Sequence, residues 1–154
     1  MKVMTLVLLR RDDSLLLGLK KRGFGKGRYN GFGGKVDDGE TIEHAAKREV
    51  LEEVGVITQS ITKVAELTFH FPHKPDWDCI VHIFLNTDWG GEGVESDEMK
   101  PAWFPINQLP FDNMWPDDKY WLPHVLDRKF VSGSFVLGEG DVILEKNLTV
   151  KELL

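Results

Sequence analysis

The sequence contains a single cysteine, Cys79, so an internal disulfide is excluded and nothing in the chain calls for an oxidising compartment. Long hydrophobic runs are also missing: the apolar stretch 3–9 ends in two arginines and two aspartates and is too short for a signal peptide or a membrane span. Basic residues number 19 against 25 acidic ones, and the formal net charge of -6 argues against binding to DNA or RNA polymers. These absences predict a soluble protein of the cytoplasm that binds neither membranes nor nucleic-acid polymers, with a mitochondrial or nuclear fraction left open.

The rest of the composition is ordinary for a globular protein, with 42% hydrophobic and 29% charged residues. A chain of 154 residues is long enough to bury about 68–70% of the surface that its unfolded form exposes. The sequence shows no internal repeat, low-complexity tract or linker. We therefore expect a single domain over residues 1–154, acting as a monomer.

Hydrophobic patterning predicts a mixed sheet and two helices. Strands are expected at 4–9, 14–19, 61–71, 79–85 and 102–106, and in a tail at 135–148 that turns at two glycines. The first helix is predicted over 41–54, with Thr41 as N-cap and Gly55 as C-cap, and the second over about 117–130, with Asp117 or Asp118 near its N-cap. This order of elements indicates an α/β fold.

A sharp change of charge separates two neighbouring segments. Residues 20–35 hold six of the 19 basic residues and six of the 15 glycines without a single acid, whereas residues 37–53 hold seven acids. Taken alone, the first segment could be a surface turn. Beside an acidic helix, however, a basic glycine-rich loop suits a phosphate chain that Lys and backbone N–H groups hold while a divalent metal bridges it to carboxylates.

Three glutamates share one face of the first predicted helix. Glu49, Glu52 and Glu53 stand at i, i+3 and i+4, where like charges repel by about 0.2–0.5 kcal/mol per pair. They also lie in the last turn, where carboxylates oppose the negative end of the helix dipole. The simpler interpretation is a solvated acidic face with an Arg48–Glu52 pair. The functional interpretation is a site for Mg²⁺ or Mn²⁺, because hard cations prefer oxygen ligands.

The spacing around these glutamates matches a known motif at every fixed position. Gly34, five residues, Glu40, seven residues and then the run from Arg48 to Val56, REVLEEVGV, reproduce G-x5-E-x7-R-E-U-x-E-E-x-G-U, where U is aliphatic. This pattern is the Nudix box, and the chain resembles the Nudix family. The segments 20–36, 94–104 (VESDEMKPAWF) and 111–121 (FDNMWPDDKYW) are similar to its animal MutT-homologue branch, the oxidised purine nucleoside triphosphatases.

The resemblance implies a Nudix α/β/α sandwich with a mixed central sheet. It also implies hydrolysis of damaged purine triphosphates such as 8-oxo-dGTP and 2-hydroxy-dATP to the monophosphate and pyrophosphate, which would clear mutagenic precursors from the nucleotide pool. Within the implied catalytic set, Arg48 orients a glutamate and Glu53, ahead of Glu49, is the general base. Metal ligation is implied for Glu49, Glu52, Glu53, the backbone carbonyl of Gly33 and Glu95, with Mg²⁺ as cofactor and Mn²⁺ as an alternative.

The substrate-binding residues that the resemblance implies divide by chemistry. Lys20 is expected near the sugar or phosphate, Trp115 stacked on the base, and a polar set along the purine edge, with apolar neighbours lining the pocket. The full set is Thr5, Lys20, Phe24, Asn30, Phe69, Trp115, Asp117, Asp118 and Trp121. If both aspartates enter an apolar pocket, burial and mutual repulsion raise the pKa of at least one of them, and one pocket then accepts both oxidised guanine and oxidised adenine.

Two features depart from the pattern of this branch. Tyr29 stands where Trp is common, and the segment 72–79, PHKPDWDC, is more polar and longer than usual. Two other functions stay open on the sequence: a Nudix hydrolase for a capped RNA end, a dinucleotide polyphosphate or a nucleotide sugar, and a nucleotide-binding module without catalysis. The base-reading set argues against the first and the complete box against the second.

Overall fold

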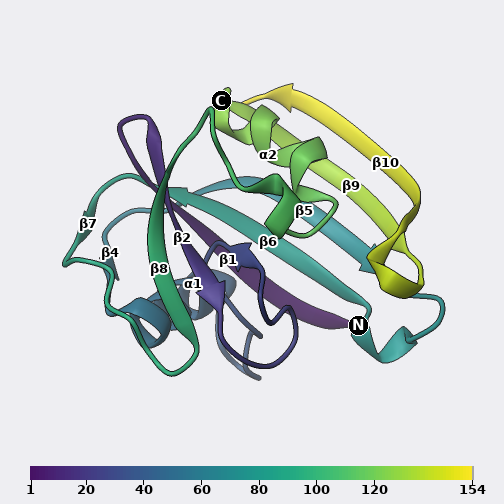
Figure 1. Cartoon of the computed structure of the whole chain (residues 1–154), viewed down its shortest axis with the longest axis horizontal. Coiled ribbons are helices and arrows are strands. Elements are labelled where there is room, and N and C mark those ends of the chain that lie inside the picture. Colours follow the sequence, from purple (N-terminus) through teal and green to yellow (C-terminus); the bar gives the residue numbers. More distant parts are fainter. Residues whose placement is uncertain (154) are drawn as a thin grey trace.

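The computed structural model describes residues 1–153 and is built around one large sheet (Figure 1). Within those residues the sheet has eight strands, seven in the order β10-β9-β5-β6-β1-β2-β3, while β8 pairs with β2. The strands are β1 (Lys2–Arg11), β2 (Ser14–Lys20), β3 (Tyr29–Asn30), β5 (Thr62–His70), β6 (Cys79–Asn86), β8 (Met99–Pro105), β9 (Lys129–Leu137) and β10 (Ile143–Glu152). Two short strands, β4 (Ile57–Thr58) and β7 (Trp89–Gly90), pair separately.

The large sheet is mixed, as predicted. Strand β1 runs parallel to β6, and β5 runs parallel to β9, whereas the other pairs are antiparallel. The strands expected from the sequence are present with shifted bounds, and the expected tail strand is divided between β9 and β10. The chain reverses between them at Gly138, whose N–H donates to the carbonyl of Val142 at 2.7 Å.

Helix α1 (Ile42–Val54) confirms the prediction for 41–54. The hydroxyl of Thr41 accepts a hydrogen bond from the N–H of His44 at 3.1 Å and caps the first turn. At the other end Gly55 takes a left-handed φ of 70°, and its N–H donates to the carbonyl of Leu51. These two caps fix which turn of the helix carries the three glutamates.

Helix α2 (Asp118–Leu126) is shorter than predicted: it ends at Leu126, and the prediction that it continues to Phe130 is wrong. The N–H of Asp127 closes the last turn on the carbonyls of Pro123 and His124, and Arg128 then adopts a left-handed φ of 59°. The chain thereby turns into β9, which buries Val131 and Phe135. Apolar periodicity continues across this reversal, so the pattern alone does not locate the end of the helix.

The two helices cover opposite faces of the sheet, with α1 behind it and α2 in front in the view of Figure 1. Alternation along β1 explains this: Val7 and Leu9 pack in the core beneath α1, whereas Leu8 packs in the core that contains Trp121 and Leu122 of α2. The predicted α/β/α sandwich is therefore confirmed. Neither helix within residues 1–153 is long and apolar enough to span a membrane.

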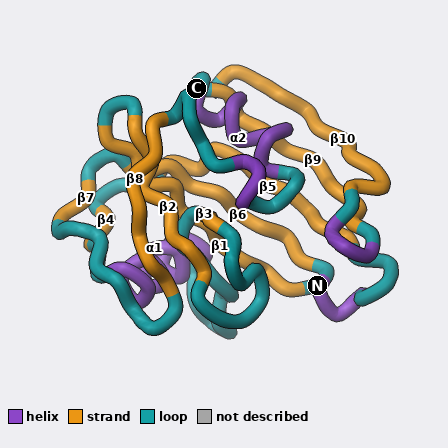
Figure 2. Tube along the Cα trace, in the orientation of Figure 1, coloured by secondary structure: helices purple, strands orange, loops and turns teal. Residues whose placement is uncertain are grey.

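The loop between β2 and β3, a teal segment in Figure 2, is the glycine-rich stretch that the sequence singled out. Its base is closed by hydrogen bonds between the backbones of Lys20 and Arg28 at 3.0 Å and of Gly27 and Lys20 at 2.8 Å. Gly23, Gly25 and Gly27 have φ values of 80°, 85° and 85°, a left-handed conformation that favours glycine. The loop can therefore curl tightly and turn its longer side chains toward the sheet.

Candidate active site

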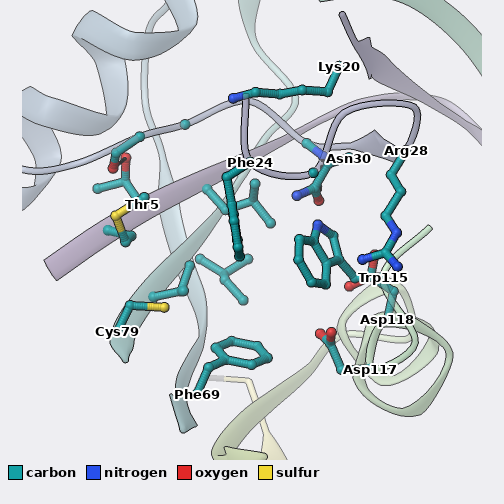
Figure 3. Close-up of a pocket in the computed structure, with 18 of the residues that line it drawn as sticks. Thr5, Lys20, Phe24, Arg28, Asn30, Phe69, Cys79, Trp115, Asp117 and Asp118 are labelled. Atoms are coloured by element: carbon teal, nitrogen blue, oxygen red, sulfur yellow. Dashed lines mark hydrogen bonds between the residues drawn. The ribbon is translucent and has the colours of Figure 1, made fainter. Parts of the chain in front are cut away.

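A cavity of about 180 Å³ lies on the side of the sheet that faces α2 and is bordered by the β2–β3 loop (Figure 3). Its wall contains all nine residues predicted to bind substrate, although they come from six separate segments of the chain. They are Thr5, Lys20, Phe24, Asn30, Phe69, Trp115, Asp117, Asp118 and Trp121, and Gly33 lines the same space. The structure thus brings the whole predicted substrate set together.

The acidic pair forms the polar end of this cavity. Asp117 and Asp118 are each 3% exposed, and the Asp117 carboxylate accepts a hydrogen bond from the indole N–H of Trp121 at 2.8 Å. Asp117 occupies the N-cap position of α2, but its side chain makes no capping bond. Its carboxylate is therefore committed to the cavity wall rather than to the start of the helix.

Burial raises the pKa of both carboxyls in this pair. For Asp118 the neighbouring charge of Asp117 adds to burial and holds the pKa well above its usual range. For Asp117 burial is partly offset by the hydrogen bond from Trp121. One oxygen of Asp118 is buried without a hydrogen-bond partner within the described residues. The pair therefore keeps a proton, and with it a hydrogen-bond donor, to a higher pH than an exposed aspartate does.

Aromatic rings form the other walls of the cavity. The Phe24 and Trp115 ring centres are 4.9 Å apart and tilted by 31°, and Phe69 stacks on Phe135 at 5.6 Å. Trp77 supports Phe24 from outside the cavity with an edge contact at 5.0 Å. Cys79 also lines the cavity, but burial raises the pKa of its thiol to about 11, which keeps it protonated and unsuited to nucleophilic chemistry.

Two glycines connect the cavity to helix α1. The N–H of Gly33 donates to a carboxylate oxygen of Glu53 at 2.7 Å, and a Cβ at Gly33 would lie 1.8 Å from the backbone oxygen of Thr5. A Cβ at Gly34 would lie 2.6 Å from the carboxyl carbon of Glu49. A side chain at Gly33 would therefore collide with the backbone of β1, whereas one at Gly34 would displace the Glu49 carboxylate.

Arg48 holds the glutamates of this region together. Its Nε and Nη2 donate to the two carboxylate oxygens of Glu40 at 2.7 and 2.9 Å, a bidentate arrangement. Its Nη1 donates to Glu49 at 2.9 Å and to Glu52 at 3.2 Å. The guanidinium holds the pKa of Glu40 down at about 2. Glu40 therefore orients Arg48, and Arg48 in turn orients Glu49.

The three glutamates differ greatly in their environment. The Glu52 side chain is 58% exposed and that of Glu49 is 17% exposed, whereas Glu53 is 3% exposed and one of its oxygens lacks a hydrogen-bond partner among residues 1–153. Burial raises the pKa of Glu49, and it raises that of Glu53 to about 8. The solvated acidic face that the sequence also allowed therefore applies to Glu52 and not to Glu53.

Comparisons with known proteins agree with this geometry. Residues 2–125 match the family model described as the NUDIX domain. The chain belongs to the Nudix family. It is 48% identical over 147 residues to the oxidized purine nucleoside triphosphate hydrolase of Mus musculus and, at the same identity and length, to that of Danio rerio; each alignment covers 96% of this chain and 94% of the relative.

A solved structure supports the same assignment to the Nudix fold. The mutator MutT protein from Bacillus halodurans superposes with a TM-score of 0.85 at 27% sequence identity, covering 96% of this chain and 97% of that one. The residues that make up the Nudix box, from Gly34 to Val56, are therefore placed on the loop and helix that the family fold uses.

The role of Glu95 beside the Nudix box stays a prediction, and Glu98 is a second acid of segment 94–104 near that site. Glu95 forms an ion pair with Lys21 and is half exposed. Glu98 is the acid of this segment whose charge raises the pKa of both Glu49 and Glu53. Three acids lie within four residues here, so the sequence alone does not show which of them faces the Nudix box.

The donor chemistry around α1 fits a divalent cation. Glu53 has a buried oxygen without a hydrogen-bond partner within the described part of the chain, and hard cations prefer such carboxylate oxygens. Within residues 1–153, however, no three Asp, Glu, His or Cys side chains converge closely enough to hold a metal as they stand. Arg48 bonds to one oxygen of Glu49 and one oxygen of Glu52, so a metal would use the second oxygen of each carboxylate while the guanidinium keeps its hold on the first.

Sequence reasoning missed three contributors to the site. Glu40 is a fixed position of the box, but its bidentate hold on Arg48 follows only from the fold. Glu98 lies just before β8 and beside the β2–β3 loop, where its carboxylate is 3.8 Å from the guanidinium of Arg22. Arg28, in the basic segment, lines the cavity and covers the Trp115 ring at 4.2 Å. The only signal for Arg28 was the segment's positive charge, which did not indicate an aromatic partner.

Proposed function

We propose that this protein hydrolyses oxidised purine nucleoside triphosphates, such as 8-oxo-dGTP and 2-hydroxy-dATP, to the monophosphate and pyrophosphate, and so sanitises the nucleotide pool. The observation that carries the proposal is one cavity that joins the base-reading residues at its acidic end to the Nudix box through Gly33. The names of the mouse and zebrafish relatives support the same substrate class. We further propose that residues 1–154 act as one domain, as a monomer and in the cytoplasm.

The proposed cofactor is Mg²⁺, with Mn²⁺ as an alternative. Glu49, Glu52 and Glu53, the carbonyl of Gly33 and an acid of segment 94–104 would hold it, with Glu98 better placed than Glu95. When bound, the cation supplies charge neutralisation at the phosphates and lowers the pKa of a coordinated water.

The chain's own residues then supply position and proton transfer. Glu53 is the proposed general base, because it is the buried carboxylate of the Nudix box and accepts a hydrogen bond from the N–H of Gly33 at the cavity wall; without metal, burial raises its pKa to about 8. Lys20 lines the cavity and its charge acts on Glu53, which places it at the phosphate end. Arg48 is a positioning residue for Glu49, which is the second candidate for the base.

Base selection rests on Asn30 and the acidic pair. The amide oxygen of Asn30 accepts a hydrogen bond from the N–H of Gly31 at 2.9 Å, which orients the side chain so that its NH₂ group can donate to a purine and its oxygen can accept a second bond. A protonated Asp118 can donate, whereas an ionised Asp117 can accept. When the proton moves from one aspartate to the other, the donor and the acceptor exchange places, so the pair can match the edge of either oxidised guanine or oxidised adenine. Trp115 supplies stacking that does not depend on the identity of the base.

The deciding experiment measures pyrophosphate release with Mg²⁺ from 8-oxo-dGTP, 2-hydroxy-dATP, O6-methyl-dGTP, dGTP and dATP. We expect a clear preference in kcat/KM for modified purines and loss of turnover in Glu53→Gln. Equal turnover of dGTP and 8-oxo-dGTP would contradict the proposed selectivity. If no triphosphate is cleaved, the panel extends to dinucleotide polyphosphates, nucleotide sugars and capped RNA, and hydrolysis there would replace the proposal.

A further inference from the structure

Arg28 connects three segments that are far apart in the sequence. Its guanidinium carbon lies 4.2 Å from the centre of the Trp115 ring, just before α2. Its Nη2 forms an ion pair at 2.8 Å with Asp141, in the turn between β9 and β10. The Arg28 and Asp141 side chains are only 27% and 24% exposed, so this is a partly buried pair rather than a solvated one.

The two sides of Trp115 have different neighbours. In the view of Figure 3, Arg28 and Phe24 lie on opposite sides of the indole. The backbone of Gly25 also packs against the indole, since a Cβ there would come within 3.3 Å of its Nε1. Phe24 covers the side of Trp115 opposite Arg28 at 4.9 Å, so a base that stacks on Trp115 there takes the place of the Phe24 ring, while the guanidinium backs the indole from the other side.

The charges of the basic loop are divided between the two ends of the cavity. Lys20 acts on Glu53 at the Nudix-box end. Arg28 acts on the acidic pair, where its positive charge lowers the pKa of Asp117 and Asp118 against the effect of burial. Membership of the same basic segment therefore does not make Arg28 a phosphate ligand.

We propose that Arg28 is a positioning residue for base recognition: it fixes the Trp115 indole from behind, and Asp141 holds Arg28 in place. This inference rests on the proposed function and adds to it a residue that acts on the base rather than on the phosphates. A guanidinium can do this better than an ammonium group because its plane stacks on the ring while its edge pairs with a carboxylate.

The test compares a ligand without phosphate with one that carries it. Binding of 8-oxo-2′-deoxyguanosine and of its 5′-monophosphate is measured by calorimetry without metal. In Arg28→Met we expect affinity for both ligands to fall by the same factor, about 3- to 20-fold. Arg28→Lys restores part of the loss, Asp141→Asn shows a smaller loss of the same kind, and in the triphosphatase assay KM rises while kcat is kept.

Matched variants separate this role from general effects. Arg11→Met removes an equivalent stack, with the guanidinium 4.2 Å from the Trp89 ring and away from the cavity, and we expect it to leave both affinities unchanged. Lys20→Met is expected to weaken the monophosphate more than the nucleoside. Thermal unfolding of each variant shows whether the fold is retained, and Arg28→Lys and Asp141→Asn carry the test if Arg28→Met does not fold.

Two results would overturn the inference while the proposed function stands. If wild-type protein hydrolyses oxidised purine triphosphates and Arg28→Met weakens only the phosphorylated ligand, Arg28 binds phosphate. If neither affinity changes in any Arg28 or Asp141 variant, the stack has no role in recognition. Failure of the wild-type protein to hydrolyse any modified purine triphosphate would remove the proposed function, and this inference with it.

Discussion

The cavity has a group of acidic residues at each end, and the two groups differ in their positively charged partners. At the α1 end, one guanidinium, that of Arg48, bonds to Glu40, Glu49 and Glu52. At the other end Asp117 and Asp118 are buried, and within the described residues no Lys, Arg or His makes an ion pair with either carboxylate. The carboxylates proposed to bind a cation thus lie beside a guanidinium, whereas those proposed to bind a neutral purine edge are buried, and burial raises their pKa.

Glu53 lies between these two cases. It belongs to the Nudix box, but it is as buried as the aspartates and its raised pKa resembles theirs. Its only hydrogen bond within the described residues comes from the N–H of Gly33. Burial, rather than the type of acid or its place in the motif, therefore decides which carboxylate can accept a proton near neutral pH.

The largest expected effect tests whether the burial of each glutamate on α1 determines how much it contributes to kcat. Glu53→Gln removes the buried acceptor, and we expect kcat for an oxidised purine triphosphate to fall by about 10²- to 10⁴-fold. Glu52→Gln, at a side chain that is 58% exposed, is expected to cost less. Glu43→Gln, on an exposed position of the same helix, serves as the control and should leave kcat unchanged. An equal loss in Glu53→Gln and Glu52→Gln would show that burial does not rank these residues.

Gly34→Ala tests the close approach of Glu49 to the backbone. The new Cβ would meet the Glu49 carboxyl carbon at 2.6 Å, so this side chain must shift while the backbone stays in place. We expect kcat/KM to fall by about 10- to 100-fold with little change in the unfolding temperature. In Gly33→Ala the clash is with the backbone oxygen of Thr5, and that variant should lose stability as well. Full activity in Gly34→Ala would contradict the placement of Glu49.

The third prediction concerns the pH dependence of stability at the base end. Because the folded-state pKa of Asp118 lies above its ordinary value, the folded protein binds this proton more tightly than the unfolded chain does. Ionisation of Asp118 therefore costs stability as pH rises above about 4, the ordinary pKa of aspartate. Asp118→Asn should unfold at a higher temperature than the wild type at pH 8, with the difference shrinking toward pH 4.

Thermal unfolding from pH 4 to pH 9 checks this, with Asp112→Asn as an exposed control in the neighbouring segment. The control should follow the wild-type curve. If the unfolding temperatures of wild type and Asp118→Asn depend on pH in the same way, ionisation of the buried aspartate does not lower the stability of the fold. The two acidic groups at the ends of the cavity would then not differ in this respect.

The sequence predicted one end of the cavity better than the other, for a physical reason. The Nudix box lies within 23 residues of chain, so helical periodicity alone places Glu49, Glu52 and Glu53 on one face, and the caps at Thr41 and Gly55 set the limits of that helix. The positions of the base-reading residues came only from a resemblance. Nothing local in the sequence states that Asn30 and Asp118 face the same space.

Contacts between distant segments were the part that the sequence could not supply. The ion pair of Arg28 with Asp141 joins positions that are more than 100 residues apart, and it depends on the reversal at Arg128 that was not foreseen. Glu98 lies just before β8, and its carbonyl accepts a hydrogen bond from the N–H of Lys21, so its place beside the β2–β3 loop depends on the pairing of β8 with β2. Local sequence patterns predict the helices and their caps. The register between paired strands and the reversals of the chain determine which side chains from distant segments come into contact.

The smallest expected effect concerns Trp77, in the polar segment 72–79 that leads from β5 into β6. Its ring packs edge-on against Phe24 at 5.0 Å and Phe71 at 5.6 Å, so it braces the aromatic wall without entering the cavity. An aromatic pair contributes about 0.5–1.5 kcal/mol, so Trp77→Ala should raise KM for 8-oxo-dGTP about 2- to 10-fold at unchanged kcat. Trp103→Ala, which breaks the Trp89 stack outside the cavity, is the matched control. A fall in kcat at constant KM would show that Trp77 acts on the Nudix-box end instead.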